Sequence, residues 1–203
     1  MARIDPLRIE DVPELEPLIR ANAERMGFVP NSLLTMARRP EILRGFAQLA
    51  IAVMGPGKVP PMLKSMVAYV ASTAAGCRYC QAHSGGRPGA SADLEKLVAA
   101  WDFETDERFS EAERAALRLA RDGAVVPNAT TEDHFREVRK YFADDQIVEI
   151  VAVISMFGWL NRWNDTMATE LEEIPLAFGS KYLAERGWSA GRHARGTASE
   201  ASV

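Results

Sequence analysis

Apolar side chains recur at spacings of three and four residues along most of this chain, which is the periodicity of an amphipathic α-helix. No segment alternates apolar and polar residues over the length of a β-strand. The pattern therefore predicts an all-α fold of roughly seven to nine helices. The helical spacing is clearest in residues 12–26, 41–53, 62–75, 92–101, 111–122, 132–142 and 146–169.

Turn and capping residues divide these segments at clear points. Ser110 with Glu113 has the pattern of a capping box, and Pro60-Pro61 suits the first turn of a helix. The last fifteen residues are small, polar and without periodicity. We expect one helical domain over residues 1–188 and a disordered tail over 189–203, and we draw no inference from His193, which lies in that tail.

Composition and charge narrow the class of protein. Apolar residues make up 47% of the 203 residues, and the formal net charge is −4, so no basic surface is expected that would bind nucleic acid. The first residues lack the apolar stretch of a signal peptide, and the longest nearly apolar run, 147–160, is shorter than the roughly 20 residues that a membrane span needs. We expect a cytoplasmic protein whose thiols are normally reduced.

The only two cysteines are three residues apart, in Cys77-Arg78-Tyr79-Cys80, and His83 follows one turn later. A helix that opens at Cys77 exposes free amides to the sulfur, and these favour the nucleophilic thiolate. The spacing places both sulfurs and His83 on one face, where the imidazole can exchange a proton with a thiol. Ser84 can donate a hydrogen bond to the Cys80 sulfur. This pattern predicts thiol–disulfide chemistry.

Two other interpretations of the cysteine pair remain open. Free cysteines are often buried and inert, and here they could simply fill a small space in the core. Cys77, Cys80 and His83 are also legitimate zinc ligands, but the fourth ligand of a tetrahedral site is missing. We therefore expect neither a metal nor a cofactor.

The stretch from Gly76 to Gly85, Gly-Cys-Arg-Tyr-Cys-Gln-Ala-His-Ser-Gly, resembles the redox motif of the alkyl hydroperoxidase D / carboxymuconolactone decarboxylase superfamily. Residues 26–32, which lead to Arg39-Pro40-Glu41, are similar to the N-terminal segment of its peroxidase-related members. Residues 157–165, Phe-Gly-Trp-Leu-Asn-Arg-Trp-Asn-Asp, resemble the late helix that carries a Leu-Asn-Arg motif. The resemblance runs from about residue 20 to about residue 180.

This resemblance implies a helical protomer that assembles into trimers or hexamers and reduces alkyl or small hydroperoxides. It implies that Cys80 is the peroxidatic thiol and Cys77 the resolving thiol. Cys80 would be oxidised to a sulfenic acid and condense with Cys77 to a disulfide. A dithiol donor, such as a lipoyl or thioredoxin-like protein, would then reduce the disulfide.

The chain departs from the family pattern at two positions of the proton relay. Ser65 stands where the hydroperoxidases have a glutamate, and Ser84 stands where they have the relay histidine. Glu149, within a run of apolar residues, is our candidate to replace that glutamate, with a structural ion pair as the alternative. Two rival functions follow: a redox-responsive binding module with little turnover, and a decarboxylase-like enzyme without redox chemistry that uses His83 and Glu149.

Overall fold

A computed structural model of the chain describes residues 2–85 and 94–195, and within these ranges it contains helices and no strand. The prediction of an all-α fold is confirmed for this part of the chain. The ten α-helices found there exceed the expected seven to nine because α2, α5 and α10 are short. The helices are α1 (Glu16–Met26), α2 (Asn31–Met36), α3 (Pro40–Met54), α4 (Pro61–Ala74), α5 (Arg78–Gly85), α6 (Leu94–Val98), α7 (Glu111–Ala124), α8 (Glu132–Val138), α9 (Asp144–Met167) and α10 (Glu173–Phe178).

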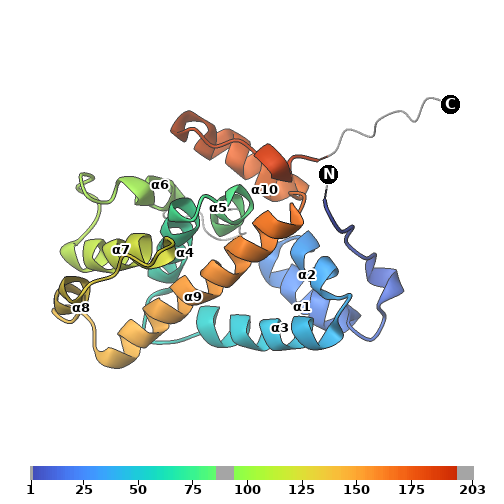
Figure 1. The fold of residues 1–203 in the computed structure, drawn as a ribbon, viewed down its shortest axis with the longest axis horizontal. Coiled ribbons are helices and arrows are strands. Elements are labelled where there is room, and N and C mark those ends of the chain that lie inside the picture. Colours follow the sequence, from blue (N-terminus) through green and yellow to red (C-terminus); the bar gives the residue numbers. More distant parts are fainter. Residues whose placement is uncertain (1, 86–93, 196–203) are drawn as a thin grey trace.

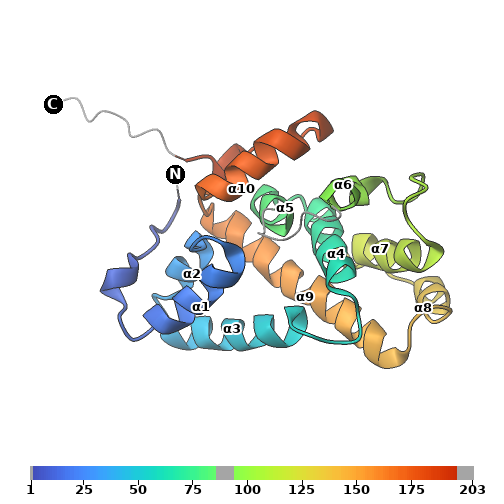
Figure 2. The ribbon, with the colours of Figure 1, turned by 180° about the vertical axis from the view of Figure 1, so that it is seen from behind.

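The long helix α9 organises the fold. Its 24 residues extend over about 36 Å, and it crosses the molecule between two groups of helices (Figure 1). One group is formed by α1, α2 and α3, and the other by α4 with α6, α7 and α8. Both views agree that α5 and α10 lie together near the C-terminal end of α9 (Figure 2). Residues about a hundred positions apart in sequence therefore meet at that end.

The core has two parts that follow this arrangement. The larger hydrophobic cluster combines buried side chains of α4, α5, α7 and α9 with the C-terminal segment. The smaller cluster belongs to the N-terminal helices and contains Leu15, Ile19 and Leu43. Phe46 of α3 and Leu160 of α9 pack against both clusters, so the two parts are continuous. None of the described helices is long and apolar enough to cross a membrane.

The C-terminal segment corrects the expected start of the tail. The chain is ordered beyond residue 188: a short 3-10 helix, η6 (Gly191–His193), packs on the core, and the His193 backbone oxygen accepts a hydrogen bond from the amide of Leu171 at 2.9 Å. His193 is 1% exposed. Its low-complexity surroundings in sequence concealed this burial, since a single inward side chain creates no periodicity. Residues 196–203 of the expected tail lie outside the described residues.

The α4–α5 turn positions the cysteine pair. Gly76 adopts φ +77°, a left-handed conformation that costs other residues energy. The amides of Gly76 and Cys77 donate to the carbonyl oxygens of Thr73 and Ser72, both at 3.1 Å, which is the hydrogen-bond pattern of a Schellman motif. Cys77 therefore takes part in the C-terminal cap of α4 and directly precedes Arg78, the first residue of α5.

Replacing Gly76 by alanine is expected to lower the free energy of unfolding by about 1 kcal/mol, because the left-handed conformation becomes strained. No heavy atom lies within 4 Å of the new Cβ, so the strain is the main cost. Gly45→Ala is the matched control: Gly45 lies inside α3, its Cβ would also meet open space, and alanine there should stabilise the helix. Urea denaturation of both variants measures the difference, and equal shifts would contradict the prediction.

Candidate active site

Cys77 and Cys80 are both buried and not joined by a disulfide. The Cys77 sulfur accepts a hydrogen bond from the amide of Cys80 at 3.4 Å, in the way that a serine hydroxyl caps a helix. Burial, followed by the interactions with Cys80 and the charge of Asp165, raises the pKa of the Cys77 thiol well above its usual range. Cys77 in this environment is a protonated thiol, so it needs a proton acceptor before it can act as a nucleophile.

Cys80 lines a cavity of about 210 Å³ that is formed by α1, α2, α3, α4, α5 and α9, and Cys77 does not line it. The Cys80 sulfur accepts a hydrogen bond from the side-chain amide of Asn164 at 3.4 Å. Most of the wall of the cavity is apolar and includes Leu33, Phe46, Met54, Met156, Phe157 and Leu160.

His83 lies on the same cavity and is paired with a glutamate that the sequence did not single out. Its Nε2 atom is 2.7 Å from Oε2 of Glu172, and the two side chains are about nine-tenths buried. The His83 ring stacks on Tyr79 with 4.0 Å between the ring centroids, and Phe28 contacts it edge-on. The imidazole is thus fixed by two aromatic rings and one carboxylate.

Glu172 is held as a carboxylate by three donors. Its Oε1 atom accepts hydrogen bonds from the amide of Asn31 at 2.5 Å and the hydroxyl of Tyr79 at 2.8 Å, and Oε2 faces His83. Burial opposes its ionisation, but His83 and the Asn31 amide outweigh burial, and the pKa of Glu172 lies below its ordinary value. Burial and the adjacent Glu172 charge raise the pKa of Tyr79, so Tyr79 remains a donor.

The two serines that depart from the family pattern both line the cavity. Ser84 does not donate to the Cys80 sulfur as expected; its hydroxyl donates to the Cys80 backbone oxygen at 2.8 Å, one helical turn earlier. Ser65 likewise donates to the backbone oxygen of Pro61 at 3.1 Å. With their hydroxyl protons engaged by the backbone, these serines shape the cavity and do not donate to the thiol.

Glu149 is not brought to the cysteines, which corrects the expectation that it relays protons to them. It lies fifteen residues before Asn164 on α9, and this spacing corresponds to about 22 Å along the helix. Its carboxylate accepts hydrogen bonds from the amides of Lys58 at 2.8 Å and Val59 at 3.2 Å and pairs with Nζ of Lys64 at 3.0 Å. The alternative of a structural ion pair describes what is observed.

Replacing Glu149 by glutamine is expected to lower the free energy of unfolding by about 1–3 kcal/mol, because Lys64, 2% exposed, would lose its carboxylate partner. The reactivity of the cysteines per folded molecule should not change. Thermal denaturation and thiol titration of the same sample measure both quantities. If the variant were as stable as the parent but its cysteines reacted more slowly, Glu149 would have to take part in the thiol chemistry.

Sequence reasoning missed Glu172 and Asn164 for different reasons. Asn164 could have been found, since it continues the buried stripe of Ile150, Phe157 and Asn161 on α9 at helical spacing, where a polar side chain is unusual. Glu172 has no such signal, because it is one of several acidic residues in a short polar segment. Only the chain reversal after α9 brings Glu172 to His83.

One group of side chains in the described part of the chain has the spacing of metal ligands. One potential ligand atom from each of Cys77, Asp165 and His193 lies within 4.8 Å of the other two. Nε2 of His193 lies 3.0 Å from Oδ1 of Asp165, and Nδ1 lies 2.8 Å from the backbone oxygen of Thr169. Nδ1 thus donates to a carbonyl oxygen and Nε2 faces the Asp165 carboxylate, and because this group offers three ligand atoms where a tetrahedral site needs four, we assign no metal to it.

These features define a class: an all-helical protein with a Cys-x-x-Cys pair, one sulfur of which lines an apolar cavity beside a His–Glu pair. Residues 40–122 match the model of the carboxymuconolactone decarboxylase family. The solved structure of the debrominase Bmp8 is 35% identical and covers 86% of this chain and 95% of its own, with a TM-score of 0.79. This chain belongs to the alkyl hydroperoxidase D / carboxymuconolactone decarboxylase superfamily, which confirms the resemblance found in the sequence.

Two further solved structures support the assignment. A cysteine-to-alanine variant of Bmp8 in complex with 2,3,4-tribromopyrrole is 33% identical, covers 88% of this chain and 96% of its own, and has a TM-score of 0.81. A peroxidase-related protein from Ralstonia eutropha JMP134 is 23% identical, covers 85% and 93%, and has a TM-score of 0.73, which supports the fold alone. A comparison with curated protein sequences finds no match.

Proposed function

We propose that this protein is a dithiol oxidoreductase that reduces a small apolar hydroperoxide through a Cys77–Cys80 disulfide cycle. One observation carries the proposal: Cys80 lines the apolar cavity beside His83, and Cys77 lies directly behind it. This arrangement suits a division of roles in which one thiol meets the substrate and the other meets only its partner. At about 210 Å³ the cavity is smaller than pockets for drug-sized ligands, which favours a small substrate.

In the first step of the proposed cycle, the Cys80 thiolate attacks the outer oxygen of the hydroperoxide. A sulfur–oxygen bond forms and the oxygen–oxygen bond breaks, so the substrate leaves as an alcohol once it has gained a proton. His83, held by Glu172, is the side chain on the cavity that can supply this proton. Cys80 becomes a sulfenic acid.

In the second step, the Cys77 thiolate attacks the Cys80 sulfur. The disulfide forms, the sulfur–oxygen bond breaks, and water leaves. A dithiol donor, such as a lipoyl or thioredoxin-like protein, then reduces the disulfide by thiol exchange. This dependence on a dithiol donor favours a cytoplasmic location. The cycle requires no metal or cofactor.

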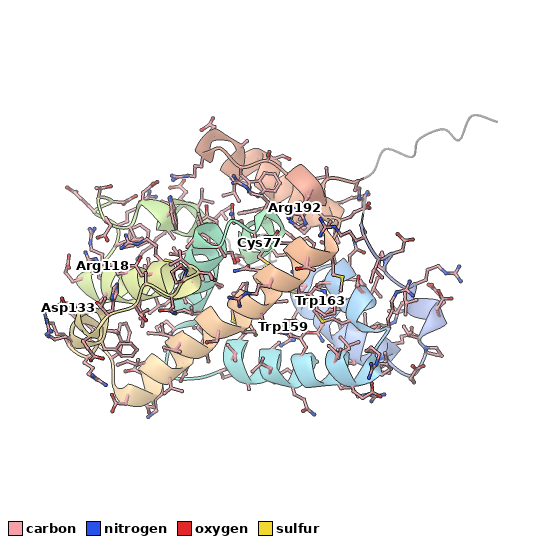
Figure 3. The ribbon with its side chains drawn as sticks, viewed as in Figure 1. Cys77, Arg118, Asp133, Trp159, Trp163 and Arg192 are labelled. Carbon is pink, nitrogen blue, oxygen red and sulfur yellow. The ribbon has the colours of Figure 1, made fainter. Side chains whose placement is uncertain are left out.

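The exposed apolar side chains favour self-association, and the trimer or hexamer expected from the sequence remains a prediction. Leu49 and Ile51 of α3 and Val148 and Trp159 of α9 are between 37% and 67% exposed. Figure 3 shows Trp159 and Trp163 along the side of α9 that faces α3, where Trp159 stacks between Phe46 and Trp163. Light scattering of the purified protein would count the subunits.

A second candidate substrate class is a small aryl bromide. It is favoured by the likeness to Bmp8, a debrominase, and by the aromatic and methionine side chains of the cavity. In that reaction the Cys80 thiolate would take the bromine from carbon, the carbon would gain a proton, and Cys77 would displace bromide from sulfur. The protein would supply the same two electrons and the same proton, so the two candidates share one site.

The deciding experiment compares substrates on fully reduced protein at neutral pH. Cumene hydroperoxide, hydrogen peroxide and a brominated pyrrole are added separately, and free thiols, alcohol and bromide are followed with time. We expect rapid loss of two thiols per chain with cumene hydroperoxide and slower loss with hydrogen peroxide, because the cavity is apolar. Bromide release without peroxide consumption would favour the second candidate, and no reaction with any of the three would refute the proposed function.

A further inference from the structure

The C-terminal segment places a second histidine–carboxylate pair at Cys77, outside the cavity that Cys80 lines. His193 of η6 and Asp165 of α9 approach Cys77, with one ligand atom of each within 4.8 Å of the other two. Neither Cys77 nor these two side chains line the cavity that Cys80 and His83 share. Figure 3 shows Cys77 beside the C-terminal half of α9, and Arg192, the residue before His193, over the end of the same helix.

Cys77 needs a proton acceptor at this position. Its side chain is fully buried, so bulk water does not reach the sulfur, and burial holds its proton in place. The titratable groups that face it are Cys80 of α5, Asp165 of α9 and His193 of η6. Tyr79 faces His193, with 5.8 Å between the ring centroids, and remains protonated.

The hydrogen bonds of His193 determine which of its nitrogens can act. Nδ1 faces the backbone oxygen of Thr169 at 2.8 Å, and because a carbonyl oxygen only accepts, Nδ1 carries a proton. Nε2 therefore holds the lone pair of the neutral ring. Once protonated, Nε2 would donate to Oδ1 of Asp165, which already lies 3.0 Å away. The site thus holds a base together with the carboxylate that stabilises its charged form.

We propose that His193 is the base that activates the resolving thiol Cys77, and that Asp165 stabilises the resulting imidazolium. This inference rests on the proposed function, in which Cys77 closes the disulfide. One ring nitrogen of His193 lies within 4.8 Å of the Cys77 sulfur, which is within reach of proton transfer after a small shift, or of transfer through one water molecule. The Asp165 side chain is 30% exposed and connects the buried pair to solvent.

The step balances without any further reagent. The Cys77 thiol gives its proton to Nε2 of His193, the thiolate attacks the Cys80 sulfur, and the group bound to Cys80 leaves with the electron pair. When a dithiol donor later reduces the disulfide, the imidazolium returns the proton to the departing Cys77 thiolate. The two histidines would therefore serve different thiols: His83 acts on the cavity side, and His193 acts on the buried side.

The test isolates the second step with a neutral probe, dipyridyl disulfide. Attack by Cys80 releases one coloured thiopyridone and leaves a mixed disulfide; attack by Cys77 then closes the Cys77–Cys80 disulfide and releases a second. In His193→Gln we expect the first release to stay within about twofold of the parent, and the second to slow by on the order of 10²-fold. The second release should slow by about tenfold in Asp165→Asn.

Two controls keep the result specific. His134→Gln removes a partly buried histidine that is also paired with an aspartate, Asp122 at 2.8 Å, far along the chain from the cysteines, and it should leave both releases unchanged. The defect of His193→Gln should also shrink as the pH is raised towards 10, because hydroxide replaces the missing base, whereas a purely structural defect would not depend on pH. Circular dichroism checks that each variant is folded.

The result that overturns the inference is a second release of equal rate in the parent, His193→Gln and Asp165→Asn. A parent protein that releases fewer than two thiopyridones per chain would overturn it as well, since Cys77 would then not attack the Cys80 disulfide. The probe is neither a hydroperoxide nor a halide. A protein that reduces neither class of substrate would refute the proposed function and still report on His193 in this assay.

Discussion

Replacing Cys80 by serine is expected to abolish hydroperoxide-dependent oxidation of the protein, with a loss of rate on the order of 10³-fold or more. Cys80 is the cysteine that lines the cavity, and serine has nearly the same size but is a far weaker nucleophile. The remaining thiol, Cys77, is fully buried and protonated, so it cannot take over the attack. Stopped-flow measurement of free thiols after addition of cumene hydroperoxide provides the rate.

Cys77→Ser is the matched control for that variant. Cys80 should still be oxidised at close to the parent rate, but only one thiol per chain is lost, because no disulfide forms. The sulfenic acid on Cys80 should then accumulate and be trapped by dimedone, which mass spectrometry detects at residue 80. If Cys80→Ser reacts as fast as the parent while Cys77→Ser does not, the roles of the two thiols are the reverse of those proposed.

Glu172→Gln is expected to reduce both stability and turnover. The carboxylate accepts hydrogen bonds from the Asn31 amide and the Tyr79 hydroxyl and pairs with His83, and a neutral amide cannot replace all three contacts. We expect a loss of about 2–4 kcal/mol in the free energy of unfolding. The rate of Cys80 oxidation should fall by on the order of 10²–10⁴-fold, because His83 loses the carboxylate that orients it and stabilises its charged form.

The acid side of the stability profile provides an independent test of Glu172. Its pKa is lower in the folded protein than the ordinary value of 4.5, so the folded state binds fewer protons than the unfolded chain. The stabilisation by Glu172 is therefore complete above pH 4.5 and is lost as the pH falls through the lowered pKa. Urea denaturation between pH 7 and pH 3 should show a smaller loss of stability for Glu172→Gln than for the parent; parallel profiles would contradict this assignment.

The sequence determined the class of fold and the location of the dithiol. Helical periodicity predicted all the long helices. One face of each helix must be buried, and this places apolar residues at spacings of three and four along the sequence. The periodicity did not predict the short helix α10, which contains Pro175; the proline lies in the first turn of the helix, where its missing amide proton has no partner to lose. The motif from Gly76 to His83 is local, and its turn and its cap follow from neighbouring residues alone.

Only the tertiary structure determines which side chains lie close enough to the two thiols to exchange protons with them. Glu149 was chosen because it is a charge in an apolar run, but helical geometry carries it to the α3–α4 loop, about 22 Å along α9 from the residue that contacts Cys80. Glu172 and His193 come from the segment after α9, which turns back over α5. A local pattern records which face of a helix is buried, and it does not record which distant residue will lie against that face. For this reason the two thiols could be found from the sequence, and the partners that control their protons could not.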